Sequence, residues 1–386
     1  MQRPKYWLHI LLFLITLATT TAAGAEWMYG RYFSSYPGST PMGWPEFWAG
    51  LNFSIPFLTV LTVHEFGHYF VAKANRVRVS LPYYIPLWLG FIAGGGSIGT
   101  MGAFIRIQEL ITSRRKYFDI GIAGPLAGFV VALALLWYGF SHLPPIDYIF
   151  TIHPEYRQYG ANFGKHLDEQ MATGKVEALA FGDNVLFWFF KTYVADPTRL
   201  PHRFEMVHYP YLLAGYLSLF FTSLNLIPIG QLDGGHVLYG LIGRRRFNAL
   251  APVLYTLFVF YAGLGLFKLS DFATSDDGIF LDQLSKLFFY ITALFLMFSR
   301  VSEQWITNLL LALSVVAVQL GLSFFFPQLE GYSGFLVFGF VLGRFLGVYH
   351  PETEQDEPLS TNRQLLGWLA LLVFLLCFSP RPFVFS

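Results

Sequence analysis

Nine long apolar stretches constrain the fold of this chain more than any other feature of its sequence. A membrane-spanning α-helix needs about 20 predominantly apolar residues. Charged residues make up 13% of the chain, about half the share of a soluble domain. The sequence therefore predicts an all-α polytopic membrane protein with about nine transmembrane helices. We expect these helices at residues 7–23, 48–72, 118–140, 211–229, 249–267, 284–299, 305–325, 332–349 and 364–379.

The distribution of Lys and Arg predicts the orientation of these helices. Cytoplasmic loops carry an excess of both residues, and most of the short basic loops fall on the inside when the N-terminus is cytoplasmic. We expect an integral, multi-pass membrane protein with its N-terminus in the cytoplasm. The first stretch could instead be a cleaved signal peptide, because Arg3 and Lys5 precede it. A net charge of +1 gives no basic surface for nucleic acid. The apolar stretches make the lipid bilayer the expected environment.

Residues 79–107 are apolar but do not have the pattern of a straight helix. Two prolines and six glycines interrupt the segment. Irregular backbone at membrane depth is tolerated only where protein buries it or where it lines a water-filled cavity. We therefore expect a re-entrant, glycine-rich β-hairpin in which Gly94–Ile107 lines a cavity. A plain connecting loop is the alternative.

The motif His64-Glu65-Phe66-Gly67-His68 places three ionisable side chains inside the second apolar stretch. Such residues are costly at membrane depth and usually serve a function. On a helix, His64 and His68 project from the same face, so their neutral imidazoles can bind one Zn²⁺. Glu65 lies about 100° around the helix and can accept a proton from a metal-bound water. A structural group of two interface histidines and a hydrogen-bonded glutamate is the alternative.

A catalytic zinc site usually has three protein ligands and one open position. Asp233 is an acidic residue that closely follows the fourth apolar stretch, and Pro228 and the nearby glycines allow the chain to turn back toward the membrane. The predicted topology places this turn and the two histidines toward the same side. We therefore expect His64, His68 and Asp233 to hold the metal. His236 is a weaker candidate, and Asp233 alone would also suit an ordinary turn.

The combination of His64-Glu65-x-x-His68 with Asn225-x-x-Pro228-x-x-x-Leu232-Asp233-Gly234 resembles the site-2 protease family of intramembrane zinc metalloproteases. The resemblance covers roughly residues 50–240 and implies a three-helix metalloprotease core in which two His and the Asp bind zinc and the Glu activates water. It implies that Asn225 supports the substrate or its oxyanion, although an asparagine can also simply join two helices. The arrangement is similar to bacterial and plastid members that lack a PDZ domain, which implies a bacterial inner membrane, with a plastid membrane as the alternative.

The sequence suggests three regions. Residues 1–47 would hold the first helix and an outside loop, and residues 48–240 would form the catalytic core, including an outside loop at 141–209. Residues 241–386 would add further C-terminal helices of no assigned role. Two histidines near the end of the long loop are expected at the surface: His202 and His208.

Together these features predict a zinc metalloprotease that hydrolyses peptide bonds within or near the transmembrane segments of membrane proteins, for regulated intramembrane proteolysis or membrane-protein clearance. Gly96 and Gly99 would let an unwound substrate approach, and the strand edge near Phe104 would bind it by β-augmentation. One alternative is a metal-ion or proton transporter that uses the same His and Asp cluster. Another is a non-catalytic receptor or chaperone. Glu65 favours the enzyme, because a transport site needs no water-activating base.

Overall fold

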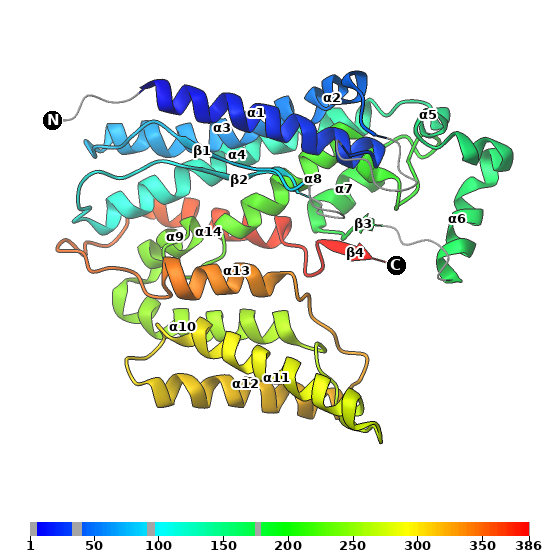
Figure 1. Ribbon diagram of the computed structural model, residues 1–386. Coiled ribbons are helices and arrows are strands. Elements are labelled where there is room, and N and C mark those ends of the chain that lie inside the picture. The colour runs from blue at the N-terminus through cyan, green and yellow to red at the C-terminus, as the bar shows by residue number, and fades with distance from the viewer. Residues whose placement is uncertain (1–5, 33–40, 91–96, 174–178, 386) are drawn as a thin grey trace. The chain divides into compact units, whose positions relative to one another are not determined.

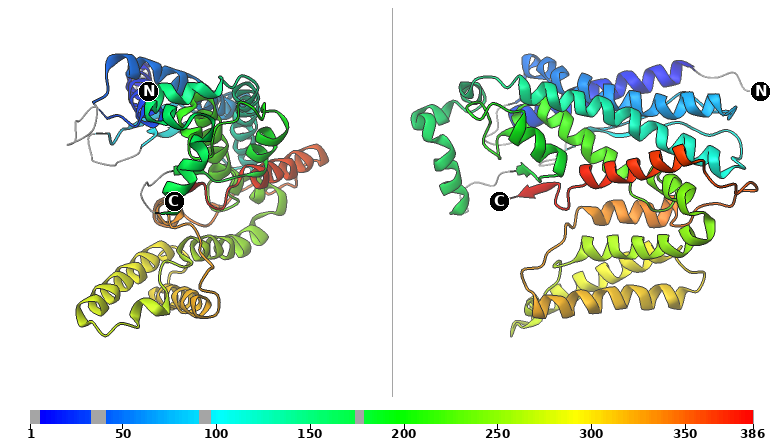
Figure 2. Two further views of the ribbon diagram at one scale, coloured as in Figure 1. Left: turned by 90° about the vertical axis from the view of Figure 1, so that its right-hand side faces the viewer. Right: turned by 180° about the vertical axis from the view of Figure 1, so that it is seen from behind.

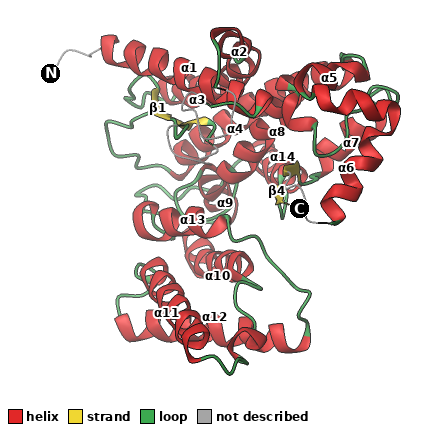
Figure 3. Ribbon diagram, turned by 45° about the vertical axis from the view of Figure 1, so that its right-hand side comes forward, coloured by secondary structure: helices red, strands yellow, loops and turns green. Residues whose placement is uncertain are grey.

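The computed structural model describes residues 6–32, 41–90, 97–173 and 179–385, and it is mostly helical with a few short strands (Figure 1; Figure 3). The chain forms two compact units. The first comprises residues 1–111, 122–225 and 372–386, and the second comprises residues 112–121 and 226–371. The predicted division at residues 47 and 240 stays a prediction.

Long apolar helices and a β-hairpin make up one part of the first unit. Helix α3 contacts both α1 and α8, and the right-hand view of Figure 2 shows α1, α3 and α4 running side by side. Because α1 also contacts both strands of the hairpin, it belongs to the folded core of this unit. The bounds are α1 (Tyr6–Tyr29), α2 (Trp44–Ala49), α3 (Leu51–Ala74), β1 (Tyr83–Leu87), β2 (Gly99–Phe104), α4 (Arg114–Ser141) and α8 (Pro210–Asn225).

Strands β1 and β2 form the predicted β-hairpin. They pair antiparallel, with Tyr83 opposite Phe104 and Leu87 opposite Gly99, and the register shifts between Tyr84 and Pro86. Such an irregularity locally increases the twist of a strand pair. The prediction of a hairpin is therefore confirmed for the strands themselves, whereas their re-entry into a membrane stays a proposal.

The segment between α4 and α8 is folded and carries short helices and a strand. Strand β3 pairs antiparallel with the C-terminal strand β4, so the end of the chain is anchored in the first unit. The hydroxyl of Tyr216 on α8 donates hydrogen bonds to the carbonyls of Gly182 and Pro382 beside this pair. The bounds are η1 (Ile146–Tyr148), α5 (Ile149–Ile152), η2 (Pro154–Asn162), α6 (Phe163–Ala172), β3 (Leu179–Phe181), α7 (Val185–Tyr193), η3 (Met206–His208) and β4 (Phe383–Phe385).

The second unit consists of helices around a core of buried aromatic side chains. Phe247, Tyr255, Phe298 and Phe335 are all less than 3% exposed. Helices α11 and α12 pack against each other and turn many apolar side chains outward, as lipid-facing helices do. The bounds are α9 (Asp233–Ile242), α10 (Arg244–Gly263), η4 (Leu269–Phe272), α11 (Asp277–Phe298), α12 (Trp305–Phe325), α13 (Phe335–Val341), the π-helix η5 (Leu342–Leu346) and α14 (Thr361–Cys377), which continues into the first unit.

All nine predicted spans coincide with helices, but the number of nine transmembrane helices is not confirmed. Within the described ranges, five helices are long and apolar enough to cross a membrane: Tyr6–Tyr29, Trp44–Ala74, Arg114–Ser141, Asp277–Phe298 and Trp305–Phe325. The others fall short for local reasons. Helix α8 ends after 16 residues, before Pro228, and α10 begins with three arginines. Helix α14 has 17 residues, and the apolar helix at Phe335–Leu346 is also short.

Candidate metal centre

His64, Glu65 and His68 lie on α3 and are buried, with exposures of 5%, 5% and 6%. The Nε2 atoms of His64 and His68 lie 3.1 Å apart, as expected for residues one helical turn apart on the same face. Two ligand atoms of a tetrahedral zinc ion, each at 2.0–2.1 Å from the metal, lie about 3.3 Å apart. The two imidazoles therefore fit a shared zinc ion.

Glycines of α4 leave the space in which these imidazoles lie. A β-carbon at Gly124 would overlap the ring of His68, and one at Gly128 would press on the β-carbon of His64 at 3.1 Å. In return, Gly67 of α3 faces the backbone of Ala123 so closely that any side chain would collide with it. Small residues allow helix backbones to approach in this way. The α3–α4 contact thus fixes both imidazoles.

His64 and Asn225 line the same small cavity in the first unit. Its volume is about 20 Å³, roughly the space of one water molecule. Asn225 ends α8, and Gly102 of the hairpin also reaches the cavity. The remaining lining residues come from α3 and α8: Phe57, Val60, Leu61, Ser218, Phe221 and Thr222. The predicted metal helix, the predicted asparagine and the hairpin therefore meet at one point.

Asp233 begins α9 after a tight turn. Gly230 has a φ of +60°, which glycine adopts at little cost. Side chains at Gly234 and Gly235 would collide with the backbone oxygens of Leu226 and Gly230. The glycines that follow Pro228 therefore make the turn that the sequence predicts, and they allow a carboxylate to be presented at the first turn of a helix.

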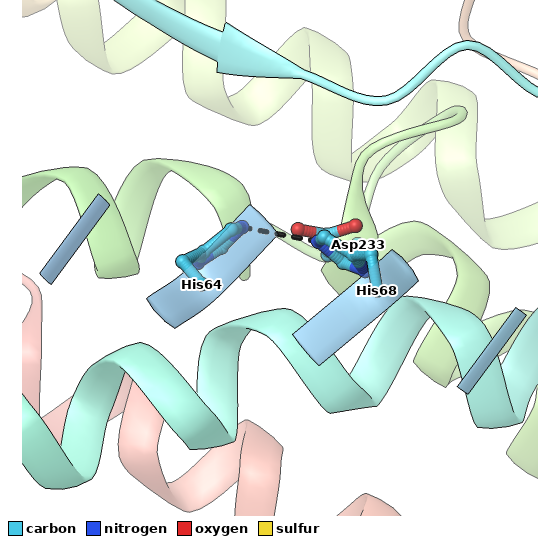
Figure 4. Close-up of side chains that lie close together, drawn as sticks. All are labelled: His64, His68 and Asp233. Carbon is cyan, nitrogen blue, oxygen red and sulfur yellow. Dashed lines mark hydrogen bonds between the residues drawn. The ribbon is translucent and has the colours of Figure 1, made fainter. Parts of the chain in front are cut away.

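Among the described residues, His64, His68 and Asp233 form a group that could hold a metal ion. Each offers one ligand atom, and these atoms lie within 4.8 Å of one another (Figure 4). Two imidazoles and one carboxylate are a common donor set for catalytic zinc, with a fourth position left for water.

His236, the weaker candidate ligand, has a different partner. Its Nδ1 lies 2.9 Å from Nε2 of His350, and its ring packs on Tyr117. Burial, together with neighbouring His236, lowers the pKa of His350 to about 3, so His350 is neutral at physiological pH. His236 thus lies on α9 in a cluster with His350 and Tyr117.

The predicted substrate-binding residues lie at different places. Gly96 falls outside the described residues. Gly99 has a φ of +81°, and its missing side chain makes room for the α1 backbone at Thr19 and Thr20. Phe104 is 47% exposed and stacks on Tyr83 of β1. The sequence reasoning did not single out Gly102, although its position next to Gly99 in a glycine-rich strand was a usable signal.

Comparison with known proteins assigns the family. The model of peptidase family M50 matches residues 52–269, which is more than half of the chain. The chain therefore belongs to peptidase family M50, and the resemblance to the site-2 protease family is confirmed.

Several similar curated proteins are plant proteins that are named as chloroplastic zinc metalloproteases. "Probable zinc metalloprotease EGY2, chloroplastic" from Oryza sativa subsp. indica is 29% identical over 196 residues, which is 50% of this chain and 30% of that protein. "Probable zinc metalloprotease EGY1, chloroplastic" from Arabidopsis thaliana is 24% identical over 257 residues, which is 64% of this chain and 41% of that protein. The chain thus spans well under half the length of these relatives. No solved structure matches it. The family and the names support the predicted class, a zinc metalloprotease, and its metal.

Proposed function

We propose that the protein is an intramembrane zinc metallopeptidase that hydrolyses a peptide bond within or near a transmembrane segment of a membrane-protein substrate. The observation that carries this proposal is the buried His64-Glu65-x-x-His68 motif on an apolar helix, with His64 and Asn225 at one cavity. Buried ionisable groups in an apolar helix are costly unless they serve a function. A bound metal and a hydrolytic reaction give all of them a role.

In the proposed mechanism, His64, His68 and Asp233 hold zinc. When bound, zinc lowers the pKa of its water toward about 7 and polarises a carbonyl group. Glu65 would take a proton from the attacking water and donate it to the leaving amine. Asn225 donates its side-chain amide to the oxyanion of the tetrahedral intermediate. The small cavity beside His64 and Asn225 has room for about one water molecule.

The substrate must expose a carbonyl group before it can react. In the interior of a transmembrane helix the carbonyls accept hydrogen bonds within the helix, so a short segment has to unwind. We propose that the edge of β2 holds the unwound segment by β-augmentation. Gly102 leaves the cavity side of that strand free of a side chain, which allows close approach of a substrate backbone.

We also propose that the chain crosses the membrane with its N-terminus in the cytoplasm and with more spans than the five longest helices. The excess of Lys and Arg in the loops assigned to the inside supports this orientation. The membrane would be a bacterial inner membrane, with a plastid membrane as the alternative.

Reconstitution of the purified protein into liposomes with a generic single-span substrate tests the proposed function. We expect cleavage within or near the span, loss of cleavage after zinc is removed with 1,10-phenanthroline, and recovery when zinc is restored. A transporter would carry zinc or protons across the bilayer without cleavage, and a receptor would do neither. Cleavage that survives complete removal of the metal would contradict the proposal.

A further inference from the structure

Three side chains outside the candidate metal centre converge between α4 and α8. His153 follows the last residue of α5, Glu205 directly precedes the short 3-10 helix η3, and His208 is the last residue of η3. Side chains three residues apart eclipse one another in a 3-10 helix, so Glu205 and His208 face the same side. The structure corrects the prediction that His208 is a surface residue, because its side chain is only 12% exposed. The carboxylate of Glu205 is 4% exposed.

The distances between the three side chains match those around a single metal ion. Nε2 of His208 lies 3.3 Å from Nε2 of His153 and 3.3 Å from Oε2 of Glu205. Nε2 of His153 lies 3.8 Å from the same carboxylate oxygen. Ligands of a tetrahedral zinc ion, at 2.0–2.1 Å from the metal, are about 3.3 Å apart. These three atoms therefore lie close to the corners of one zinc coordination sphere.

Second partners determine which nitrogen of each imidazole carries a proton. Nδ1 of His208 lies 2.6 Å from the carbonyl oxygen of Met28, and Nδ1 of His153 lies 2.8 Å from Oε1 of Glu155. Both oxygens are acceptors, so both Nδ1 atoms donate. In the neutral imidazoles the Nε2 lone pairs are then directed at one another and at Glu205. Metal-binding histidines are held in this way by carbonyl and carboxylate oxygens.

The carboxylate of Glu205 also lacks a full set of partners. The hydroxyl of Tyr156 donates to Oε1 at 3.1 Å, whereas the buried Oε2 has no hydrogen-bond partner among the described residues. Burying a carboxylate oxygen without a partner is energetically costly. The Nε2 lone pairs of His153 and His208 and Oε2 of Glu205 would repel one another if nothing lay between them. A cation bound by all three atoms would remove this repulsion.

We propose that His153, Glu205 and His208 form a second binding site for a divalent transition-metal ion, and that zinc is the ion that suits it. Two imidazoles and one carboxylate are typical zinc donors. The site shares no residue with the candidate metal centre. Through His208 and the carbonyl of Met28, a bound ion fixes the segment between α4 and α8 to the end of α1. We infer a structural role for this ion.

Metal counting with the full-length protein tests the proposal. The purified protein is stripped with a chelator, equilibrated with excess zinc, desalted and measured by mass spectrometry. The substitutions His64→Ala/His68→Ala remove two proposed ligands of the candidate metal centre, so the zinc that remains is bound at the second site. This measurement does not depend on whether the protein is a protease. We expect one zinc ion per chain in this doubly substituted protein. Adding Glu205→Gln, which keeps the shape of the side chain, should remove it. His166→Ala changes another histidine of the same segment and should keep the ion.

Thermal unfolding provides a second readout that does not depend on metal counting. Zinc should raise the Tm of the stripped His64→Ala/His68→Ala protein, since a ligand that binds only the folded state stabilises it. The rise should disappear with Glu205→Gln and also with His153→Gln, which alters a more exposed ligand. If zinc content and Tm are the same with and without these substitutions, the three side chains form only a hydrogen-bonded cluster and the proposal is wrong.

Discussion

The two imidazoles of α3 face each other at 3.1 Å between their Nε2 atoms, inside an apolar helix. A neutral pair can share one proton in a hydrogen bond, but burial of both rings and of Glu65 at the depth of an apolar helix is costly. A bound metal ion would account for all three residues, because the two imidazole nitrogens would hold it and Glu65 would take a proton from the water that it activates. At the scale of single residues, His64 and His68 are therefore the proposed zinc ligands, and Glu65 is the proposed base.

Alanine substitution of a proposed ligand should lower zinc affinity. We expect His64→Ala, His68→Ala and Asp233→Ala each to weaken binding by at least roughly 100-fold, more than the loss of an outer-shell partner does. Competition with a fluorescent chelator measures the change. His236→Ala is the matched control, because the imidazole of His236 contacts His350, and it should keep its zinc. Unchanged affinity in Asp233→Ala would mean that another residue is the third ligand.

At the scale of helices and strands, the contact between α3 and α4 decides where the imidazoles lie. Gly124 has no room for a side chain beside His68, whereas Gly321 on α12 has open space around it. We expect Gly124→Ala to displace His68, to destabilise the protein by about 1–3 kcal/mol and to weaken zinc binding. Gly321→Ala is the matched control and should be neutral or stabilising, since alanine favours helix by about 1 kcal/mol. Similar Tm and zinc affinity in the two variants would refute this role of Gly124.

Two glycines of β2 should respond differently to the same substitution. Both have positive φ, at +81° for Gly99 and +103° for Gly102, so alanine strains both positions by about 1–2 kcal/mol. A side chain at Gly99 would also collide with α1, while the one at Gly102 would meet open space beside the His64 cavity. Gly99→Ala should therefore lower Tm more, and Gly102→Ala should lower the cleavage rate more. The opposite order would place the substrate elsewhere on the hairpin.

The sequence predicts some elements well and their ends poorly. Apolar length identifies helices such as α3 and α4, and the combination of prolines and glycines identifies β1 and β2 as irregular backbone. Apolar length does not reveal that α8 ends at Asn225 or that α10 begins at Arg244. Helix ends depend on local turns and on tertiary packing, which a count of apolar residues does not include. The predicted number of nine spans therefore stays a prediction.

At the scale of the whole molecule, residues that are distant in sequence are the hardest to predict. The two histidines of α3 are four residues apart, and helix geometry alone brings them together. His153 and Glu205 are joined only by the fold of the segment between α4 and α8. The pattern Glu205-x-x-His208 was a local signal for part of that cluster, since residues three apart meet on a 3-10 helix. No local sequence pattern relates Glu205 or His208 to His153.

The match to peptidase family M50 ends at residue 269, so the helices that follow it have no counterpart in the family model. These helices belong to the second unit, which also contains Asp233 and its turn. All residues with a proposed catalytic or metal-binding role lie within the matched region, and α11, α12 and α13 have no proposed catalytic role. Glu65 is proposed to transfer protons and not to bind the metal.

Zinc content and cleavage measured side by side for wild type and Glu65→Gln test that claim most directly. The amide keeps the size of the side chain but cannot accept the proton of the water. The account predicts that Glu65→Gln keeps the zinc of wild type and loses cleavage of a single-span substrate by about 100-fold or more, the scale of general-base catalysis. Loss of zinc together with cleavage would make Glu65 a ligand or a structural support, and wild-type cleavage by the variant would remove it from the mechanism.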